Sequence, residues 1–211
     1  MAEGRDVRAT WAEFVRDSDL SKIRERLACN PATPVSLETL QALLKLRSAR
    51  MMSMLAAVPC SPGPDVSRDE LLETAAAARQ LAVNRLESQA EVEQRRRALG
   101  ERVYAAALKA ELSSDMDAAY ARLTEALNKG DFDTVAAMAA ESLGGEAESR
   151  EYHLIMVKER NRAWIPGLRT ELDAGNAVIV VGAAHLPGPD GLVSLLRQAG
   201  YDVRRTMLST D

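Results

Sequence analysis

The residues best suited to chemistry lie at positions 182–188, where the sequence reads GAAHLPG after the apolar run of residues 177–181. Such an apolar, β-branched run is typical of a strand buried on both faces of a parallel sheet, and open α/β sheets gather their chemistry at the carboxyl ends of strands. An imidazole there can ligate a metal or transfer protons. The chain has 2 histidines. His185 is the first candidate for either role, and we expect His153 to lie at the surface or at the boundary of the core.

Three further polar residues are candidates for the same site. A catalytic metal needs nitrogen or oxygen ligands and an open position for water. Glu87 ends a short strand-like segment, where it could be a second ligand or the base that takes the proton of that water. Arg160 and Asn161 are neighbours in a predicted helix and therefore point to different faces. Arg160 can pair with a carboxylate, Glu87 among them, and Asn161 can orient His185.

Each candidate also has a purely structural interpretation. His185 can bond the backbone of its own turn, which is rich in glycine and proline. Glu87 directly precedes a predicted helix, whose positive end stabilises a carboxylate. Arg160 can be a buried ion-pair partner with no chemical role. Gly182 and Gly188 suit unusual backbone geometry or a close approach between segments. The residues alone leave these alternatives open.

The wider pattern around His185 resembles a known family. Read together, ERN…W…AGNAVIVVGAAHLPGPDGLVSLLRQAGYDV is similar to the C-terminal part of the TraB/PrgY/GumN family. That family is related to the TIKI-type metal-dependent peptidases and, more distantly, to erythromycin esterase-like proteins. The resemblance is strongest over residues 152–203. It continues more weakly over residues 34–97, where NRLESQ looks like the family's short strand ending in an acidic residue.

The resemblance implies a metal-dependent hydrolase that acts on peptides or another small substrate. It assigns catalytic roles to Glu87, Arg160 and Asn161, a divalent metal to His185 and Glu87, and a binding role to Gly182 and Gly188. The alternative is a non-catalytic peptide-binding or inhibitory protein of the pheromone-shutdown type. Peptide binding that survives chelation and the loss of His185 would favour the alternative.

One departure from the family pattern concerns the second half of the site. Family members carry two G-x-x-H motifs, the first on a strand near the N-terminus. This sequence has one, at residues 182–185. We therefore expect half of the family's metal site, in a chain that is either a fragment or a truncated member, with weak metal affinity and little or no activity.

The predicted fold is α/β and predominantly helical, a single domain over residues 1–211. A helical body is expected over residues 34–150, and its start and stop signals include Ser36, a capping box at Ser88–Glu91, Asp115 and Gly130. One helix should run from Ser36 to Val58, residues 59–64 should form a loop, and another helix should run from Ser88 past Leu99 to Ala110. Trp164 should be a core residue. Residues 148–164 should form a further helix, which Pro166 should kink or restart. A small βαβ unit should follow, with strands at residues 177–183 and 201–207. Residues 83–86 are a candidate third strand of a larger sheet, and an exposed edge of that sheet would favour self-association.

Bulk properties exclude several functions. The formal net charge of −4 and the pI of 5.4 argue against nucleic acid as the main partner. No run approaches the ~20 apolar residues of a membrane span, and the N-terminal residues have no apolar core of a signal peptide. The compartment stays open. So does the state of Cys29 and Cys60, which are either two free thiols or a disulfide.

Overall fold

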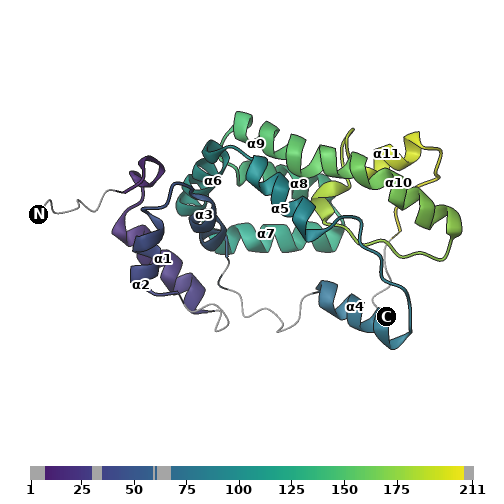
Figure 1. Ribbon diagram of the computed structural model, residues 1–211, viewed down its shortest axis with the longest axis horizontal. Helices are drawn as coiled ribbons and strands as arrows, with labels where there is room; N and C mark the ends of the chain where they lie inside the picture. Colours follow the sequence, from purple (N-terminus) through teal and green to yellow (C-terminus); the bar gives the residue numbers. More distant parts are fainter. Residues whose placement is uncertain (1–7, 30–34, 59, 61–67, 207–211) are drawn as a thin grey trace, which may run out of the picture.

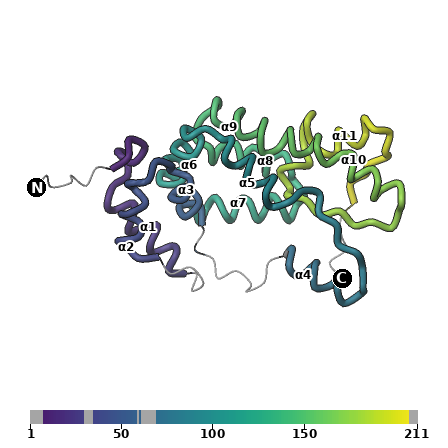
Figure 2. The backbone as a smooth tube through the Cα atoms, viewed as in Figure 1, coloured from purple at the N-terminus to yellow at the C-terminus, as the bar shows by residue number. Residues whose placement is uncertain are grey.

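The structure is a computed structural model that describes residues 8–29, 35–58, 60 and 68–206. These residues form helices joined by loops (Figure 1, Figure 2). The α-helices are α1 (Asp17–Ala28), α2 (Leu37–Leu43), α3 (Arg50–Ala56), α4 (Arg68–Ala78), α5 (Gln89–Ala98), α6 (Glu101–Ser113), α7 (Met116–Lys129), α8 (Phe132–Glu141), α9 (Glu146–His153), α10 (Glu159–Ala174) and α11 (Leu192–Gln198). Three short turns complete the set: η1 (Thr10–Ala12), the π-helical η2 (Leu154–Lys158) and η3 (Ala183–His185). No described helix has both the length and the apolar character needed to cross a membrane.

The larger core lies at the N-terminal end, where α1, α2 and α3 pack together and against α6. Its members are apolar residues at helical spacing, which places them on one face of each helix. Leu20, Ile23, Leu40 and Met52 are fully buried in it. Ser36 caps α2 by accepting the backbone N–H of Thr39, as its position in the sequence predicts.

The structure divides a predicted helix in two between α2 and α3. The apolar spacing from Leu37 to Val58 indicated one continuous face, but the chain leaves the helix near Leu44. Residues distant in the sequence form hydrogen bonds with the backbone at this break. The N–H of Ala9 donates to the carbonyl of Leu44 at 2.8 Å, and the carboxylate of Glu101 accepts from the N–H of Ala49 at 2.5 Å. These contacts join residues that are far apart in the sequence, so the local spacing of apolar residues could not reveal them.

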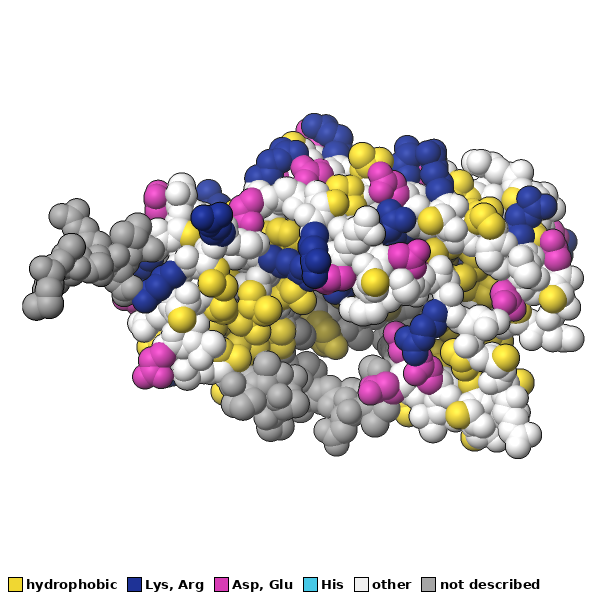
Figure 3. Space-filling model, viewed as in Figure 1, with side chains coloured by type: hydrophobic (Ala, Val, Ile, Leu, Met, Phe, Trp, Pro, Cys, Tyr) yellow, Lys and Arg dark blue, Asp and Glu magenta, His cyan; other side chains and the backbone are white. Residues whose placement is uncertain are grey.

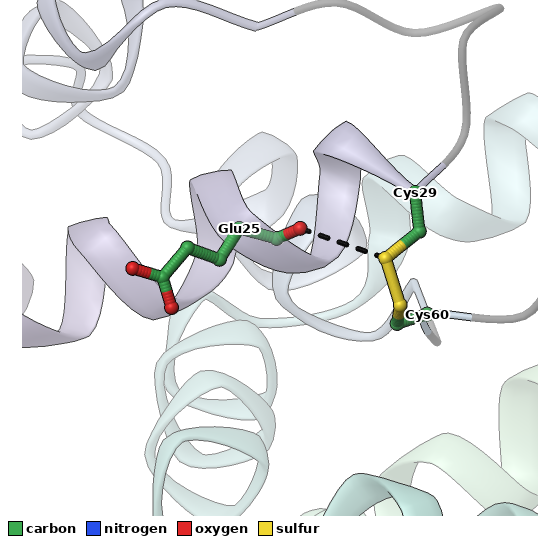
Figure 4. Close-up of a disulfide and its surroundings, with 3 residues drawn as sticks. All are labelled: Glu25, Cys29 and Cys60. Carbon is green, nitrogen blue, oxygen red and sulfur yellow. Dashed lines mark hydrogen bonds between the residues drawn. A yellow bond between two sulfur atoms is a disulfide. The ribbon is translucent and has the colours of Figure 1, made fainter.

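A disulfide joins Cys29, at the end of α1, to Cys60, beyond the end of α3 (Figure 4). The bridge spans 31 positions of sequence and encloses α2 and α3. The sulfur of Cys29 lies 3.7 Å from the carbonyl oxygen of Glu25, one helical turn back. Of the two alternatives for these cysteines, the structure therefore has the disulfide. The predicted loop at residues 59–64 lies outside the described residues apart from Cys60.

The middle of the chain follows its capping signals. Ser88 and Glu91 form the predicted capping box at the start of α5. Asp115 caps α7 through the N–H of Ala118. Gly130 ends α7 in the left-handed conformation, at φ 61°.

Helices α9 and α10 follow one another without a gap, joined by the π turn η2. A π turn holds one more residue than an α-helical turn and often marks a functional position. The helix continues through Pro166 to Ala174, so Pro166 does not restart it, and the predicted alternative of a kink stays a prediction. Trp164 and Leu168 flank the proline and are both buried. Their packing offsets the loss of the backbone hydrogen bond that proline, without an N–H, cannot donate.

The predicted α/β class, with its βαβ unit and larger sheet, is wrong, because no strand occurs among residues 8–29, 35–58, 60 and 68–206. Residues 177–181 make no backbone hydrogen bond to any described residue. Ile179 and Val181 pack against a second, small core of Trp164, Leu168 and Leu192. The apolar run therefore covers a helix instead of pairing with another strand.

The other two predicted strands are also absent. Residues 83–86 and 201–206 are irregular, and the carbonyl of Val203 accepts a hydrogen bond from Arg197 instead of from a neighbouring strand. The described residues consequently form no sheet edge of the kind through which we expected self-association. The helix expected between the two C-terminal strands is present as α11.

Candidate functional site

The four polar candidates from the sequence converge on one place. Arg160 and Asn161 lie in the first turn of α10, and His185 ends the 3₁₀ turn η3. Glu87 lies just before α5. The structure therefore brings together residues that are up to 98 positions apart in the sequence, and we call Glu87, Arg160, Asn161 and His185 the polar cluster.

Arg160 and Glu87 form a two-pronged ion pair. Nε of Arg160 lies 3.1 Å from both carboxylate oxygens of Glu87, and Nη2 contacts Oε1 as well. The two side chains are only 17% and 16% exposed. The remaining nitrogen, Nη1, donates to the carbonyl of Met156 in the π turn at 3.0 Å. The guanidinium is thus held from two sides.

His185 is buried between Arg160 and Asn161. Its Nδ1 lies 2.7 Å from Oδ1 of Asn161, and its Nε2 lies 3.3 Å from Nη1 of Arg160. A guanidinium can only donate, so Nε2 must accept, and the proton of the neutral ring must lie on Nδ1. The amide of Asn161 donates to the carbonyls of His185 and Asp190 at 3.1 and 2.8 Å, which fixes its orientation.

Trp164 packs against two members of the polar cluster, the charged side chain of Arg160 and the neutral ring of His185. Its ring centroid lies 4.9 Å from the guanidinium carbon of Arg160 and 4.7 Å from the centroid of the His185 ring. The first contact is a cation–π interaction. The indole Nε1 is buried and has no hydrogen-bond partner among the described residues. Trp164 was predicted to be a core residue, and the structure confirms this.

Burial lowers the pKa of His185 from 6.5 to about 4, and the neighbouring charge of Arg160 adds to the effect. Between those two values the unfolded chain binds a proton that the folded chain does not. The free energy of unfolding should therefore fall as the pH drops from 6.5 toward 4, and stay constant with respect to this group above 6.5.

The expected loss between pH 8 and pH 5 is about 2 kcal/mol. Urea unfolding at both pH values checks it, with His185→Gln as the test variant and His153→Gln as the matched control, because His153 is exposed. The slope of the free energy of unfolding against pH should persist in His153→Gln and become much smaller in His185→Gln. Equal slopes in all three proteins would show that His185 is not the group responsible.

The polar cluster does not fit a metal ion as it is arranged. The two candidate ligands, the Glu87 carboxylate and Nε2 of His185, both face the same guanidinium. A divalent cation bound to them would lie against the positive charge of Arg160. Within the described residues, no three side chains of histidine, cysteine, aspartate or glutamate are grouped as metal ligands.

The glycines of the motif have different structural roles. Gly188 has φ +81°, which disfavours any residue with a Cβ. Gly182 has an ordinary backbone, and a Cβ there would touch only the His185 ring, at 3.5 Å. Gly191 is the position that the sequence did not single out: a Cβ there would lie 2.1 Å from the carbonyl oxygen of Pro187. The binding role expected for Gly182 and Gly188 stays a prediction.

Asp190 is a second residue that the sequence did not single out. Its carboxylate forms ion pairs with Lys158 in the π turn at 3.1 Å and with Arg162 in α10 at 3.4 Å. Its carbonyl accepts from Asn161. Asp190 therefore ties the loop after His185 to the long helix. Its place in the turn sequence PGPDG favours a side chain that bonds neighbouring backbone, so no signal in the sequence pointed to these distant contacts.

One of three comparisons with known proteins gives a family. The sequence pattern described as the TraB/PrgY/gumN family matches residues 5–205. The match includes both regions of resemblance, residues 34–97 and 152–203, together with the residues between them. No curated protein and no solved structure gives a significant match.

Proposed function

The chain belongs to the TraB/PrgY/gumN family, and from this premise we propose that it is a non-catalytic peptide-binding protein. Family membership is compatible both with this role and with metal-dependent hydrolysis. The observation that carries the choice is the position of Arg160, which engages the two side chains that a catalytic metal would need. Asn161 supports the same reading, because it holds His185 with Nε2 turned toward the guanidinium.

A peptide ligand is supported by residues 177–181, which lie against the same helix as the polar cluster. Their backbone donors and acceptors have no partner among the described residues. Val178 is 88% exposed and Val180 is 53% exposed, while Ile179 and Val181 pack inward. This alternation is that of an extended segment. Extended peptides bind such segments through main-chain hydrogen bonds.

Metal titration separates the two roles. We expect calorimetry with Zn²⁺ and Mn²⁺ to give no one-to-one binding to the wild-type chain, and the same result for His185→Ala. A stoichiometric metal that binds the wild type and is lost in His185→Ala would overturn the proposal. Chelator-sensitive cleavage of peptides by the purified chain would overturn it as well.

Peptide binding is tested with a soluble probe of alternating valine and threonine flanked by lysines. We expect it to bind the wild type equally well with and without a chelator, and to bind His185→Ala with similar affinity. Val180→Pro removes one backbone donor from an exposed position, so binding should weaken about 2- to 12-fold. Val180→Thr keeps the donor and is the matched control. A probe that binds no form of the chain, or binds Val180→Pro as tightly as Val180→Thr, would contradict the role of residues 177–181.

A further inference from the structure

A second surface with binding character lies further along α5 from the polar cluster and is formed by other side chains. An open groove of about 560 Å³ runs between α3, α5 and the start of α6. Its apolar lining is Leu46, Met51, Met54, Leu99 and Tyr104, and its charged lining is Arg50, Glu93, Arg96, Arg97 and Glu101. Figure 3 shows apolar side chains gathered around α3, with lysine and arginine side chains along one edge.

Three of the apolar side chains that line the groove are unusually exposed for their size. Leu46, Met51 and Met54 are 48%, 51% and 48% exposed, although the large N-terminal core lies directly beneath them. Contiguous exposed apolar surface rimmed by polar groups marks interaction sites in soluble proteins. Methionine is common on such surfaces, because its flexible side chain adapts to different partners.

Both carboxylates of the groove are already engaged. Glu93 accepts from both terminal nitrogens of Arg50, at 2.6 and 2.7 Å, and this contact lowers its pKa to about 2. Glu101 accepts the backbone N–H of Ala49. The charge of Glu93 is therefore already neutralised by an arginine of the groove, and Glu93 stays ionised throughout the neutral range.

The arginines of the groove are not balanced in the same way. Arg50 is held by Glu93, and Arg97 reaches the same carboxylate at the longer distance of 3.4 Å. Arg96 forms no ion pair with any described residue, and its backbone carbonyl is fixed by the hydroxyl of Tyr104 at 2.6 Å. The lining thus carries 3 arginines against 2 glutamates, and its surplus positive charge lies beside the exposed methionines.

We propose that this groove docks a partner segment that combines apolar side chains with a carboxylate, as an acidic amphipathic helix does. The apolar face of the partner would cover Met51 and Met54, and its carboxylate would reach Arg96. Charge complementarity selects an acidic segment over a basic one. This interaction does not depend on the polar cluster, nor on the peptide role of residues 177–181.

The probe is a fluorescein-labelled 14-residue amphipathic peptide of leucine and glutamate, measured by fluorescence anisotropy. We expect saturable binding that weakens at high salt, and no binding of the same peptide with lysine in place of glutamate. Arg96→Glu should weaken binding at least tenfold, and Met51→Gln should weaken it as well. Arg24→Glu is the matched control, because Arg24 is an exposed arginine on α1 outside the groove, and it should leave the affinity unchanged.

Two results would overturn the docking site. One is the absence of saturable binding to the wild type, and the other is equal affinity in Arg96→Glu and Arg24→Glu. Val180→Pro keeps this test separate from the peptide role above, since it should not change the affinity for the acidic probe. Weakening by Val180→Pro together with an unchanged Arg96→Glu would place the probe on residues 177–181 and reject the groove.

Discussion

Replacing Arg160 with alanine is expected to lower the free energy of unfolding by about 3–5 kcal/mol, the usual cost of breaking a buried ion pair from one side. The loss has three parts: Glu87 is left as an unpaired carboxylate that is only 16% exposed, the carbonyl of Met156 loses a donor, and Trp164 loses its cation–π contact. For a chain of this length the change corresponds to a drop in melting temperature of roughly 6–20 °C. Thermal and urea unfolding of Arg160→Ala measure it.

The matched control is Arg150→Ala on α9. Arg150 pairs with Glu146, but the two side chains are 68% and 85% exposed, and exposed pairs contribute at most about 1 kcal/mol. Arg160→Met combined with Glu87→Leu should recover much of the loss, since it removes both charges together. Equal melting temperatures for Arg160→Ala and Arg150→Ala would show that Arg160 is not a buried structural partner.

Opening the disulfide between Cys29 and Cys60 is expected to lower the free energy of unfolding by about 4 kcal/mol. In the chain-entropy account a bridge stabilises by restricting the unfolded chain, and the effect grows with the enclosed loop, here 31 positions. The enclosed helices α2 and α3 supply much of the N-terminal core, Leu40 and Met52 included. The whole N-terminal end should therefore become less stable.

The measurement compares urea unfolding of the wild type with and without a non-thiol reductant. The control is the double variant Cys29→Ser and Cys60→Ser, which should resemble the reduced wild type and show no response to reductant. A wild type whose unfolding midpoint is the same in both conditions, with the bridge shown open by thiol counting, would contradict a stabilising role for the disulfide.

Local signals in the sequence predicted local structure well. The cap at Ser36, the capping box at Ser88 and the stop at Gly130 all appear as expected, because each depends on residues within one turn of the helix end. The breaks at Leu44 and Gly100 were missed. Both depend on distant carboxylates: Glu101 takes the N–H of Ala49, and Glu151 takes the N–H of Gly100 at 2.7 Å.

The sheet was predicted wrongly for a related reason. An apolar β-branched run becomes a strand only if another segment pairs with its backbone. Residues 177–181 have the composition of a buried strand, but in the described chain their inward side chains Ile179 and Val181 pack on α10 and α11. Composition therefore predicted both the secondary structure and the burial incorrectly, because one face of this segment, with Val178 and Val180, is exposed.

The polar cluster was the most predictable part of the site. Residue types suggested the contact between Arg160 and Glu87 and the orientation of His185 by Asn161 among several alternatives, and both contacts are present. What residue types could not reveal is that one guanidinium faces Glu87 and Nε2 of His185 together. That arrangement decides whether Glu87 and His185 are metal ligands or structural partners of Arg160. It arises only when the π turn, α10 and η3 come together.

The most direct test of this account is nitrogen-15 NMR of the His185 imidazole, recorded with and without added Zn²⁺. His153→Gln assigns the signals, because the chain has 2 histidines. We predict a neutral ring that is protonated on Nδ1, that titrates at a pKa of about 4, and that is unchanged by Zn²⁺ because Arg160 already engages Nε2. A ring that titrates near 6.5, or an Nε2 signal that shifts with one equivalent of Zn²⁺, would contradict it and favour the metal-dependent role.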